Sequence, residues 1–504
     1  MITTTREASV QEVDEALRKS WGAYNEYKKK NLKERAEFMR AIAAEMESVA
    51  DQLIDIANQE TSLGEARLKT ELVRTQFQLS SYANACEKGS WLDIRIDTPL
   101  SAKKNGIDKK TAVKKNDLRK MLVPLGPVVV FGASNFPFAY STAGGDTACA
   151  LAAGCPVIIK AHPAHAQTSE MVAEAVQRAA QRSGLSESVF IHLHGGFETG
   201  RALVQHPLTS AVGFTGSFEG GKSLFDLAQK RAVPIPVFAE MGSVNPIFIL
   251  PKKLKHDAPG LASLMAESIT QSAGQFCTNP GILVGIEDEV LEEFERLLGE
   301  RIETVRPQKM LHPGIAQNFL QKREKLLAET SVELAAVTEF EAGEEESIPT
   351  LAEVSAKTFL KNRMLHHEVF GPLSLLVKCE DINEMVEVAR SMEGQLTSTL
   401  IASDEELLRH EMLVDALKSI CGRLILNGVP TGVEVALSMH HGGPFPATTD
   451  SRFTAVGADG IKRFARPLCF QNWTNELLPP ELKNENTLGL WRTVNDELTR
   501  EPIR

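Results

Sequence analysis

Apolar residues in the first part of the chain recur at the spacing of an α-helix. Between residues 9 and about 90 they follow one another every three or four positions, as at Val13, Leu17 and Trp21, with charged residues between them. This period puts the apolar side chains on one face of a helix. We therefore expect an amphipathic helical layer that covers a sheet.

The pattern changes near Met121, where short apolar runs begin to alternate with helical patterns. Runs rich in apolar and β-branched residues predict buried strands at residues 128–131, 157–159, 189–191 and 211–214. Helical patterns lie around them at residues 143–153, 169–181 and 221–230. Strands that alternate with helices form a mostly parallel sheet, and ligands bind beyond the carboxyl ends of its strands.

A second alternating α/β pattern follows Asn245. It predicts strands at residues 246–250, 282–285, 369–377, 399–401 and 424–426, and helices at residues 258–271 and 290–304. The boundary between the two patterns lies near residue 248. A lysine-rich stretch at residues 103–120 favours a solvated hairpin or arm over an anion-binding patch.

Composition and charge narrow the class of protein. The 504 residues are 43% hydrophobic and 24% charged, which is typical of a globular chain with two or three domains. A formal net charge of -11 opposes nucleic acid as the main partner. Seven scattered cysteines favour a reducing compartment over a disulfide framework. Because we find no signal peptide and no long apolar run, we expect a soluble cytoplasmic protein without a membrane partner.

Candidate chemistry centres on Cys277, in the stretch Ala273–Gly281. A lone cysteine is often a small buried hydrophobe, but this one is flanked by Gly, Gln, Thr and Asn, and reactive thiols need such a polar setting. Cys277 is therefore the candidate nucleophile. The other six cysteines have apolar or helical surroundings and are expected to be structural: Cys86, Cys149, Cys155, Cys379, Cys421 and Cys469.

Two further residues supply groups that thioester chemistry requires. Glu240 follows the apolar run Val237–Ala239, where partial desolvation would make it a usable base. The alternative is a helix cap or a surface acid. Asn135 follows the strand at residues 128–131, and its amide is a candidate donor to an oxyanion. The alternative for Asn135 is a turn in which it bonds to its own backbone.

Other segments of the chain bear on phosphate and metal binding. The glycine-rich turn Gly213–Gly221 precedes a helix whose N-terminus is a candidate phosphate site, although the GxGxxG fingerprint is absent. Lys160, at a strand end, is either solvated or a ligand to ribose or phosphate. We predict no metal site, because the histidine pairs lack cysteines or carboxylates at ligand spacing. These pairs are His162/His165, His192/His194, His366/His367 and His440/His441.

Four motifs resemble those of the aldehyde dehydrogenase superfamily, and the match covers nearly the whole chain. They are Gly213–Ser217, Glu240–Gly242, Gly274–Cys277 and Glu368–Pro372. The segments at residues 131–137, 143–147, 160–165, 234–240 and 441–446 look like the α-ketoglutaric semialdehyde (2,5-dioxopentanoate) dehydrogenase branch. NADP-dependent fatty aldehyde dehydrogenases of luminous bacteria look similar in the same segments.

The resemblance implies a fold of two Rossmann-like α/β domains with a small bridging and oligomerisation element. Residues 1–248 would form the helical layer and the dinucleotide-binding domain, with a bridging arm at residues 103–124. Residues 249–441 would form the catalytic domain that carries Cys277. Residues 442–504 would return to the cofactor domain and to the oligomer interface.

The resemblance also implies roles for individual residues. Cys277 would attack the aldehyde, Asn135 would hold the oxyanion, and Glu240 would activate the water that hydrolyses the thioester. Residues expected at the cofactor are Lys160, His162, Ser134, Gly216, Ser217, Met241, Glu368 and Phe370. His441 would line the substrate pocket, and Arg452, close to it in sequence, is a candidate cation for a carboxylate product.

Two departures from the family pattern affect cofactor and assembly. Pro163 stands where many NAD-preferring members carry a glutamate that binds the adenosine 2′-hydroxyl, so NADP is expected, with NAD as the alternative. The segment Leu490–Arg500 lacks the clean β-strand seen in many family tetramers. A homodimer or homotetramer is expected.

The leading hypothesis is NAD(P)-dependent oxidation of an aldehyde to a carboxylic acid through a thiohemiacetal and a thioester. The implied substrate is α-ketoglutaric semialdehyde and the product 2-oxoglutarate. One alternative is an NADP-dependent long-chain fatty aldehyde dehydrogenase. An alternative of another class is a cysteine hydrolase or acyltransferase that needs no cofactor.

Overall fold

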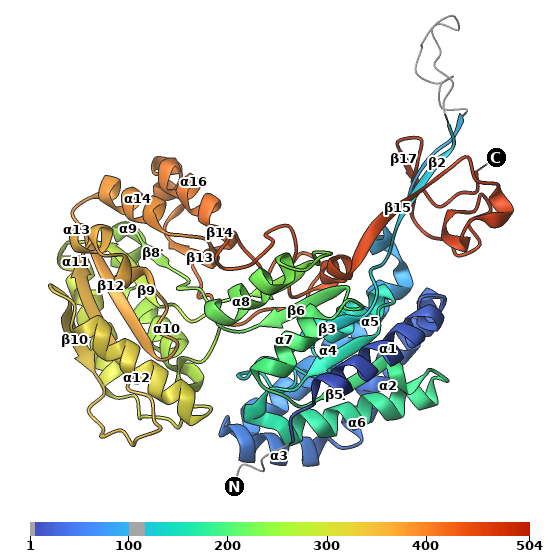
Figure 1. Cartoon of the computed structure of the whole chain (residues 1–504). Coiled ribbons are helices and arrows are strands. Elements are labelled where there is room, and N and C mark those ends of the chain that lie inside the picture. Colours follow the sequence, from blue (N-terminus) through green and yellow to red (C-terminus); the bar gives the residue numbers. More distant parts are fainter. Residues whose placement is uncertain (1–5, 100–115, 504) are drawn as a thin grey trace, which may run out of the picture.

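The computed structural model describes residues 6–99 and 116–503 of the chain. It contains three sheets, and two of them are the centres of separate α/β bodies (Figure 1). The predicted α/β class with mostly parallel sheets is confirmed. Within these two ranges, no helix is both long and apolar enough to cross a bilayer.

Four helices form the N-terminal layer, in agreement with the helical period of that region. They are α1 (Val10–Tyr27), α2 (Leu32–Glu47), α3 (Ala50–Thr61) and α4 (Glu65–Lys88). The first two begin with capping boxes at Ser9 and Asn31, which satisfy free N–H groups of the first turn. α4 ends at Gly89 with a left-handed φ of 68°, a conformation that suits glycine.

The first sheet has five parallel strands in the order β5-β4-β3-β6-β7. Its strands are β3 (Val128–Phe131), β4 (Val157–Lys160), β5 (Phe190–Leu193), β6 (Ala211–Thr215) and β7 (Val237–Glu240). Its helices are α5 (Gly145–Ala153), α6 (Ala166–Arg182), α7 (Phe197–Gln205) and α8 (Phe218–Gln229). Because all strands are parallel, their carboxyl ends bring Lys160 and Glu240 to the same edge of the sheet.

The second sheet has seven strands in the order β10-β11-β12-β9-β8-β13-β14, parallel except for β10. They are β8 (Ile247–Ile249), β9 (Ile282–Ile286), β10 (Glu333–Val337), β11 (Thr350–Ser355), β12 (Leu373–Cys379), β13 (Gln395–Ile401) and β14 (Cys421–Leu426). The helices are α9 (Pro251–His256), α10 (Ala258–Thr270), α11 (Glu289–Glu303), α12 (Pro313–Leu327), α13 (Ala356–Lys361), α14 (Ile382–Ser391), α15 (Asp404–Arg409) and α16 (Glu411–Ile420).

Two features of the second sheet differ from the sequence prediction. β10 and β11 were missed, and three of the five residues of β10 are exposed, so this edge strand lacks a buried apolar run. The strand predicted at residues 369–377 begins only at Leu373. Pro372 has no N–H to donate to a ladder, so residues 369–372 stay in a loop.

The third sheet joins segments that lie far apart in sequence and projects from the first body, at the upper right of Figure 1. Its order is β15-β2-β1-β16-β17. The strands are β1 (Arg95–Asp97), β2 (Leu118–Pro124), β15 (Ala465–Gln471), β16 (Arg492–Val494) and β17 (Glu497–Thr499). The segment Leu490–Arg500, which had been expected to lack a clean strand, contributes two short ones, β16 and β17.

Of the lysine-rich stretch at residues 103–120, residues 103–115 lie outside the described residues. Its described end forms part of β2. There Arg119 is buried rather than solvated, pairs with Asp117 and donates to the carbonyl of Leu482 at 2.7 Å. The expectation of a solvated arm is therefore wrong for Arg119, because the C-terminal segment covers it.

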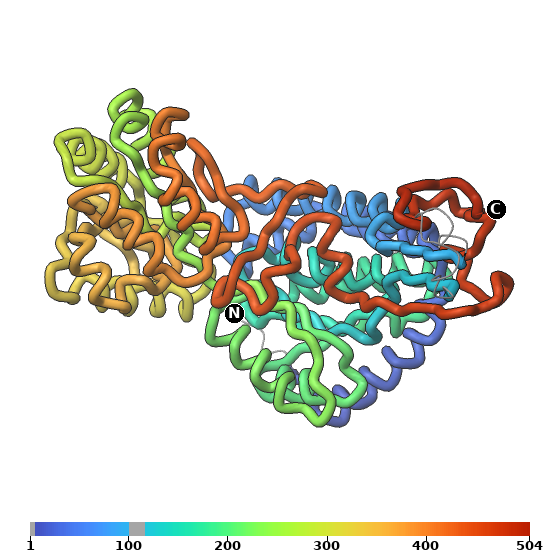
Figure 2. The backbone as a smooth tube through the Cα atoms, turned by 90° about the horizontal axis from the view of Figure 1, so that it is seen from above, coloured from blue at the N-terminus to red at the C-terminus, as the bar shows by residue number. Residues whose placement is uncertain are grey.

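Two chain segments connect the α/β bodies close to Glu240. β7 ends at Glu240 and β8 begins at Ile247, so residues 241–246 lead from the first sheet to the second. The returning C-terminal segment, red in Figure 2, runs back along the first body. It forms a bridge from Thr448 to Glu240, and Met241 donates its N–H to the carbonyl of Ala447 at 2.8 Å. Both connections therefore fix the backbone around Glu240.

Candidate active site

Cys277 lies in a tightly packed loop between α10 and β9. Gly274, three residues before it, has a φ of 65°, and a Cβ there would lie 2.3 Å from the backbone of Gly371. Asn279 donates its side-chain amide to the carbonyls of Gly274 at 2.7 Å and Gly371 at 3.0 Å. Asn245 donates to the carbonyl of Cys277 at 2.9 Å. The glycines and amides that flank Cys277 thus fix its position.

Cys277, His441 and Glu240 form one connected group. The Cys277 Sγ lies 3.5 Å from His441 Nε2, and the same nitrogen lies 2.9 Å from Glu240 Oε1. Glu240 is only 3% exposed and His441 1% exposed, while Cys277 is partly buried. His441 is 164 positions from Cys277 and 201 positions from Glu240 in the sequence. The three side chains therefore meet where the first sheet faces the loop of the second body.

The hydrogen bonds of His441 indicate which nitrogen carries its proton. Within the described residues, Nδ1 is buried without a hydrogen-bond partner. A buried N–H without a partner is costly, and a neutral imidazole carries a single N–H. We therefore assign the proton to Nε2, which donates it to Glu240 Oε1. The second oxygen of Glu240, Oε2, is buried and has no partner in the described part of the chain.

The thiol of Cys277 is held in its neutral form. Desolvation raises its pKa well above the ordinary value, and the negative charge of Glu240 raises the pKa further. Arg423 opposes this shift only in part. A resting thiol needs a base to become a nucleophile, and Glu240 is next to it.

Asn135 lies in the loop after β3, beside the cysteine loop. Its side chain is 8% exposed and donates to the carbonyl of Gln275 at 3.1 Å. The amide has two N–H groups, so one remains for another acceptor. Its neighbour Ser134 is half-buried in the same loop. The alternative in which Asn135 bonds only to its own turn does not apply, because its partner is 140 residues away.

The glycine-rich turn between β6 and α8 lies next to Glu240. The Gly216 N–H donates to the carbonyl of Glu240 at 3.1 Å, and Ser217 is the N-cap of α8, with its Oγ accepting from Gly220. The Met241 side chain packs against Gly221, where a Cβ would lie 2.7 Å from the Met241 side chain. This helix N-terminus therefore presents N–H groups to the same region as the base.

Lys160 and His162 lie at and after the end of β4. Lys160 donates to the carbonyl of Gly195 at 2.8 Å, and burial lowers its pKa to about 8, with Glu7 partly offsetting that effect. His162 accepts from the N–H of Ala164, and desolvation lowers its pKa well below the usual value. At neutral pH the lysine is thus charged and the histidine neutral.

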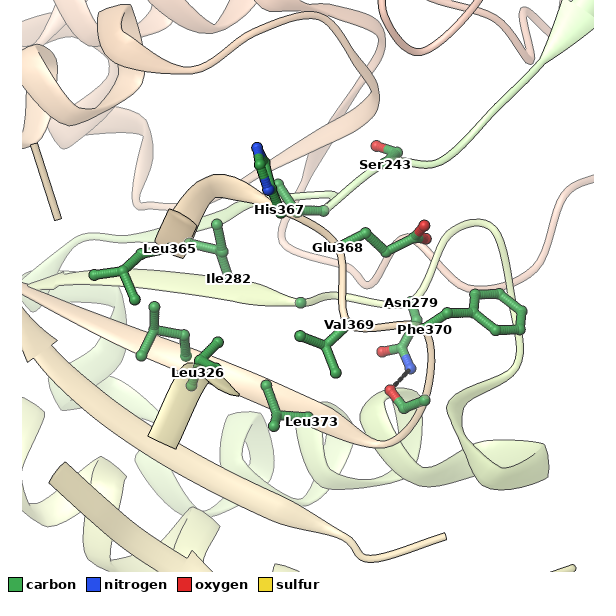
Figure 3. A pocket seen from close by; sticks show the side chains of 14 residues that line it. Ser243, Asn279, Ile282, Leu326, Leu365, His367, Glu368, Val369, Phe370 and Leu373 are labelled. Atoms are coloured by element: carbon green, nitrogen blue, oxygen red, sulfur yellow. Dashed lines mark hydrogen bonds between the residues drawn. The ribbon is translucent and has the colours of Figure 1, made fainter. Parts of the chain in front are cut away.

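Glu368 and Phe370 extend from the loop before β12 (Figure 3). The Glu368 carboxylate lies against Gly242, where a Cβ would be 2.4 Å from Oε2. Desolvation raises the pKa of Glu368 to about 7. The cavity behind this loop is about 20 Å³, lined mainly by aliphatic residues such as Leu326 and Leu365. It has space for about one water molecule, which is too little for a substrate.

Two sequence-based expectations are not supported by these positions. The Arg452 side chain is 80% exposed and pairs with Asp450 at 2.6 Å, so it does not join the group around Cys277. Cys469 is exposed on β15, whereas an apolar environment had been expected. In both cases residues nearby in sequence gave no guide to the environment in the fold.

Sequence reasoning also missed features that the fold brings together. Arg67, on α4, donates to the Asn135 carbonyl at 2.6 Å, and Asn245 supports the loop of Cys277. Asn245 has a φ of 44°, and its position before Pro246 was the available signal. The thiol, His441 and Glu240 also present ligand atoms of the kind that metals bind, all within 4.8 Å of one another. The histidine pairs alone had suggested no such cluster.

Comparison with known proteins gives a consistent result. The model of the aldehyde dehydrogenase family matches residues 1–448. An α-ketoglutaric semialdehyde dehydrogenase of Acinetobacter baylyi is 41% identical over 98% of this chain and 93% of its own length. The α-ketoglutaric semialdehyde dehydrogenase 2 of Azospirillum brasilense is 44% identical over 96% and 91%, respectively.

Solved structures agree at the level of the fold. Betaine aldehyde dehydrogenase of Staphylococcus aureus superposes with a TM-score of 0.78 at 16% identity, covering 94% of this chain and 90% of that one. Aldehyde dehydrogenase 21 of Physcomitrella patens gives 0.76 at 18% identity, covering 92% and 91%. With the family match and the two relatives, these findings show that the chain belongs to the aldehyde dehydrogenase family and is an oxidoreductase that acts on aldehydes.

Proposed function

We propose that the protein oxidises α-ketoglutaric semialdehyde to 2-oxoglutarate with a nicotinamide cofactor. Two relatives above 40% identity carry this activity in their names. The observation that carries the proposal is the buried group of Cys277, His441 and Glu240, connected by contacts of 3.5 and 2.9 Å. A thiol and a carboxylate base are the groups needed to form a thioester and to hydrolyse it.

Cys277 is the nucleophile in this proposal. Its proton passes to Glu240, its sulfur forms a bond to the aldehyde carbon, and the carbonyl oxygen becomes an oxyanion. Asn135 donates to that oxyanion through the N–H that Gln275 leaves free. A nicotinamide, when bound, would supply the acceptor for the hydride of the thiohemiacetal, so that a thioester would remain on Cys277.

Glu240 releases the proton taken from Cys277 to solvent and, as a carboxylate again, acts on water. Its Oε1 accepts from His441, and its Oε2 has no partner within the described ranges, so Oε2 is the atom that takes the proton. The water oxygen bonds to the thioester carbon, the C–S bond breaks, and the proton returns to the sulfur. His441 is a positioning residue in this step, because it holds the carboxylate at a fixed angle to the thioester.

The residues around Glu240 fit a dinucleotide. The N-terminus of α8 supplies N–H groups and its N-cap Ser217 a hydroxyl as donors for a pyrophosphate, with Gly216 directly before them in the turn. Lys160 supplies a positive charge at the end of β4, and Glu368 supplies a carboxylate for ribose hydroxyls. This donor set supports cofactor binding at the edge where the strands of the first sheet end.

NADP is the proposed form of the cofactor, with NAD as the alternative. Position 163 is a proline, so no carboxylate there repels a 2′-phosphate. Lys160 is close by and has a pKa of about 8, so it is mostly protonated at neutral pH. A Pro163→Glu variant should shift the ratio of kcat/KM for NADP and NAD towards NAD.

The test of the proposed function is a rate measurement with purified protein. Formation of the reduced nicotinamide is followed with α-ketoglutaric semialdehyde or decanal, and with NAD or NADP in parallel. We expect the semialdehyde and NADP to give the highest kcat/KM, and Cys277→Ser to abolish turnover. A preference for decanal would instead support a long-chain aldehyde dehydrogenase, and ester cleavage without cofactor would support a hydrolase.

A homo-oligomer, as dimer or tetramer, is also part of the proposal. The third sheet and the segment around it expose large apolar side chains. These are Trp473, Leu477, Leu488, Trp491 and Leu498, each between 45% and 69% exposed. Five such residues on one projecting element support its burial against a second copy of the chain. Light scattering on a sizing column measures the assembly directly.

We also propose the three-part layout and location expected from the sequence. Residues 1–248 would bind the dinucleotide, residues 249–441 would carry the nucleophile, and residues 442–504 with the arm at 103–124 would serve assembly. A cytoplasmic location is supported by the seven cysteines, all of which are free thiols. Limited proteolysis and cell fractionation would test the layout and the location.

A further inference from the structure

The proposed substrate carries a carboxylate at the end opposite its aldehyde, so its pocket needs a cation. Arg452, the candidate from the sequence, is exposed and already paired with Asp450. A different arginine lies beside the oxyanion donor. Arg67, in the first turn of α4, donates Nη2 to the carbonyl of Asn135 at 2.6 Å.

Two aromatic rings hold the guanidinium of Arg67. Its central carbon lies 5.0 Å from the ring centre of Phe136 and 5.1 Å from that of Phe276. Phe136 follows Asn135 in the chain, and Phe276 precedes Cys277. The two rings lie edge to face, 5.6 Å apart. Arg67 is therefore anchored by cation–π contacts to both loops that carry the candidate reacting groups.

One terminal nitrogen of this guanidinium has no hydrogen-bond partner among the described residues. Nη1 of Arg67 is buried and makes no hydrogen bond to any described residue. Glu71, one helical turn further on, is near enough to act on the charge of Arg67, but no ion-pair contact joins the two side chains. Its Oε1 accepts from the N–H groups of Phe138 and Ala139, and its Oε2 is buried without a hydrogen-bond partner among the described residues. A buried cationic donor without an acceptor is costly, and a carboxylate is its best partner.

The other arginines near the site are already satisfied at their ends. Arg74 donates Nη1 to Gln78 and Nη2 to Tyr140. Arg423, close enough to influence Cys277, donates both Nη1 and Nη2 to backbone carbonyls of residues 430–432. Only Arg67, of these three, keeps a buried terminal nitrogen free for a ligand.

We propose that Arg67 binds the carboxylate of the substrate and so selects short aldehydes that end in an acid group. The inference rests on the proposed function and names the residue that recognises the charged end of the substrate. Nη1 donates to a carboxylate oxygen, while Nη2 stays on the carbonyl of Asn135. Binding the acid group beside Asn135 positions the aldehyde at the other end for Cys277.

The test compares a charged and an uncharged aldehyde of the same chain length. For wild type and Arg67→Gln, kcat/KM is measured with α-ketoglutaric semialdehyde and with pentanal. We expect Arg67→Gln to lose roughly ten- to a hundredfold for the semialdehyde, the range of one charge-assisted hydrogen bond. Its kcat/KM for pentanal should fall by a smaller factor, because that substrate loses only the support that Arg67 gives to the Asn135 loop.

Matched variants separate recognition from structure. Lys69→Gln removes a positive charge from the same turn of α4, but Lys69 is exposed, so both substrates should be unaffected. Arg67→Lys keeps the positive charge but lacks the planar guanidinium, so it should retain part of the preference for the semialdehyde over pentanal. If Arg67→Gln does not fold, the substrate ratio of Arg67→Lys decides, with an unchanged ratio overturning the inference.

The remaining outcomes point to different errors. Equal losses for both aldehydes in Arg67→Gln would show that Arg67 only supports the Asn135 loop. A specific loss in Arg452→Gln would return the role to Arg452. If wild type itself did not prefer the semialdehyde over pentanal, the proposed function would fail, independently of any variant.

Discussion

At the scale of single residues, one imidazole nitrogen of His441 contacts both other members of the candidate site. His441 Nε2 contacts both Cys277 and Glu240, the proposed nucleophile and base, while its Nδ1 is buried without a partner in the described chain. The bond to Glu240 leaves a single carboxylate oxygen for proton transfer. The sequence placed His441 in the pocket without a defined role, and the contact with Glu240 supplies one.

We predict that Glu240→Gln separates the two half-reactions when it is assayed at high pH, where Cys277 can lose its proton to solvent and no longer needs Glu240 as its base. The amide is close in shape to the carboxylate but cannot take a proton from water, so hydrolysis should slow by roughly a hundredfold or more. Mass spectrometry of the intact protein during turnover should then show an acyl adduct on Cys277. His441→Phe should slow hydrolysis less, because the base remains but loses its fixed orientation. Absence of an adduct in Glu240→Gln would refute the assignment of the base.

The reactivity of Cys277 in the cofactor-free protein should follow the direction of its pKa shift. A raised pKa means that the thiolate fraction near neutral pH is smaller than for free cysteine, and it grows only at higher pH. Alkylation by iodoacetamide should therefore have its midpoint above that of free cysteine. A Cys469→Ser background removes the exposed thiol from the measurement. A midpoint at or below that of free cysteine would contradict the neutral resting thiol.

At the scale of elements, the loop before β9 packs so closely on a second loop that no side chain fits between the two backbones. Gly274 meets the backbone of Gly371, and both loops carry residues of the site. The sequence identified the glycines around Cys277 as points of close approach. It could not identify Gly371 as the partner, because the two loops lie almost a hundred positions apart.

We predict that Gly274→Ala destabilises the protein more than another glycine substitution with a similar backbone. At Gly184, φ is 62° and a Cβ would meet nothing within 4 Å, so alanine there causes only backbone strain. At Gly274 the clash adds about 1–3 kcal/mol. For a chain of 504 residues, the thermal midpoint of Gly274→Ala should then lie about 1–3 °C below that of Gly184→Ala. Equal midpoints would mean that the loops can separate at little cost.

At the scale of the whole molecule, three sheets share the work of positioning the site. The first provides Glu240 and the proposed cofactor edge, and the second provides the loop of Cys277, the proposed nucleophile. The C-terminal segment passes Glu240 before it reaches the third sheet. That sheet presents exposed apolar residues away from the site, as expected for a surface that another copy covers.

The proposed assembly predicts a specific effect of charge on the third sheet. Leu498, on β17, is 68% exposed, and Leu498→Glu should shift the mass from light scattering towards the monomer. Leu334, on β10 of the second sheet, is 52% exposed and serves as the matched control. Leu334→Glu should leave the mass unchanged. If only Leu334→Glu dissociated the protein, the interface would lie on the second body.

The sequence by itself determined the α/β class, the helical layer, the strands of the first sheet, and the segments that carry Cys277, Glu240 and Asn135. These properties depend on the local period of apolar residues and on local composition, and both are set by residues close together in sequence. The tertiary structure alone decided that His441 joins the thiol to the base, and that Arg67 rather than Arg452 lies beside Asn135. Arg452 is near His441 in sequence, but Asp450 binds it at the surface. The partners of a side chain depend on which distant segments the fold brings together, and the residues around it in sequence do not determine those segments.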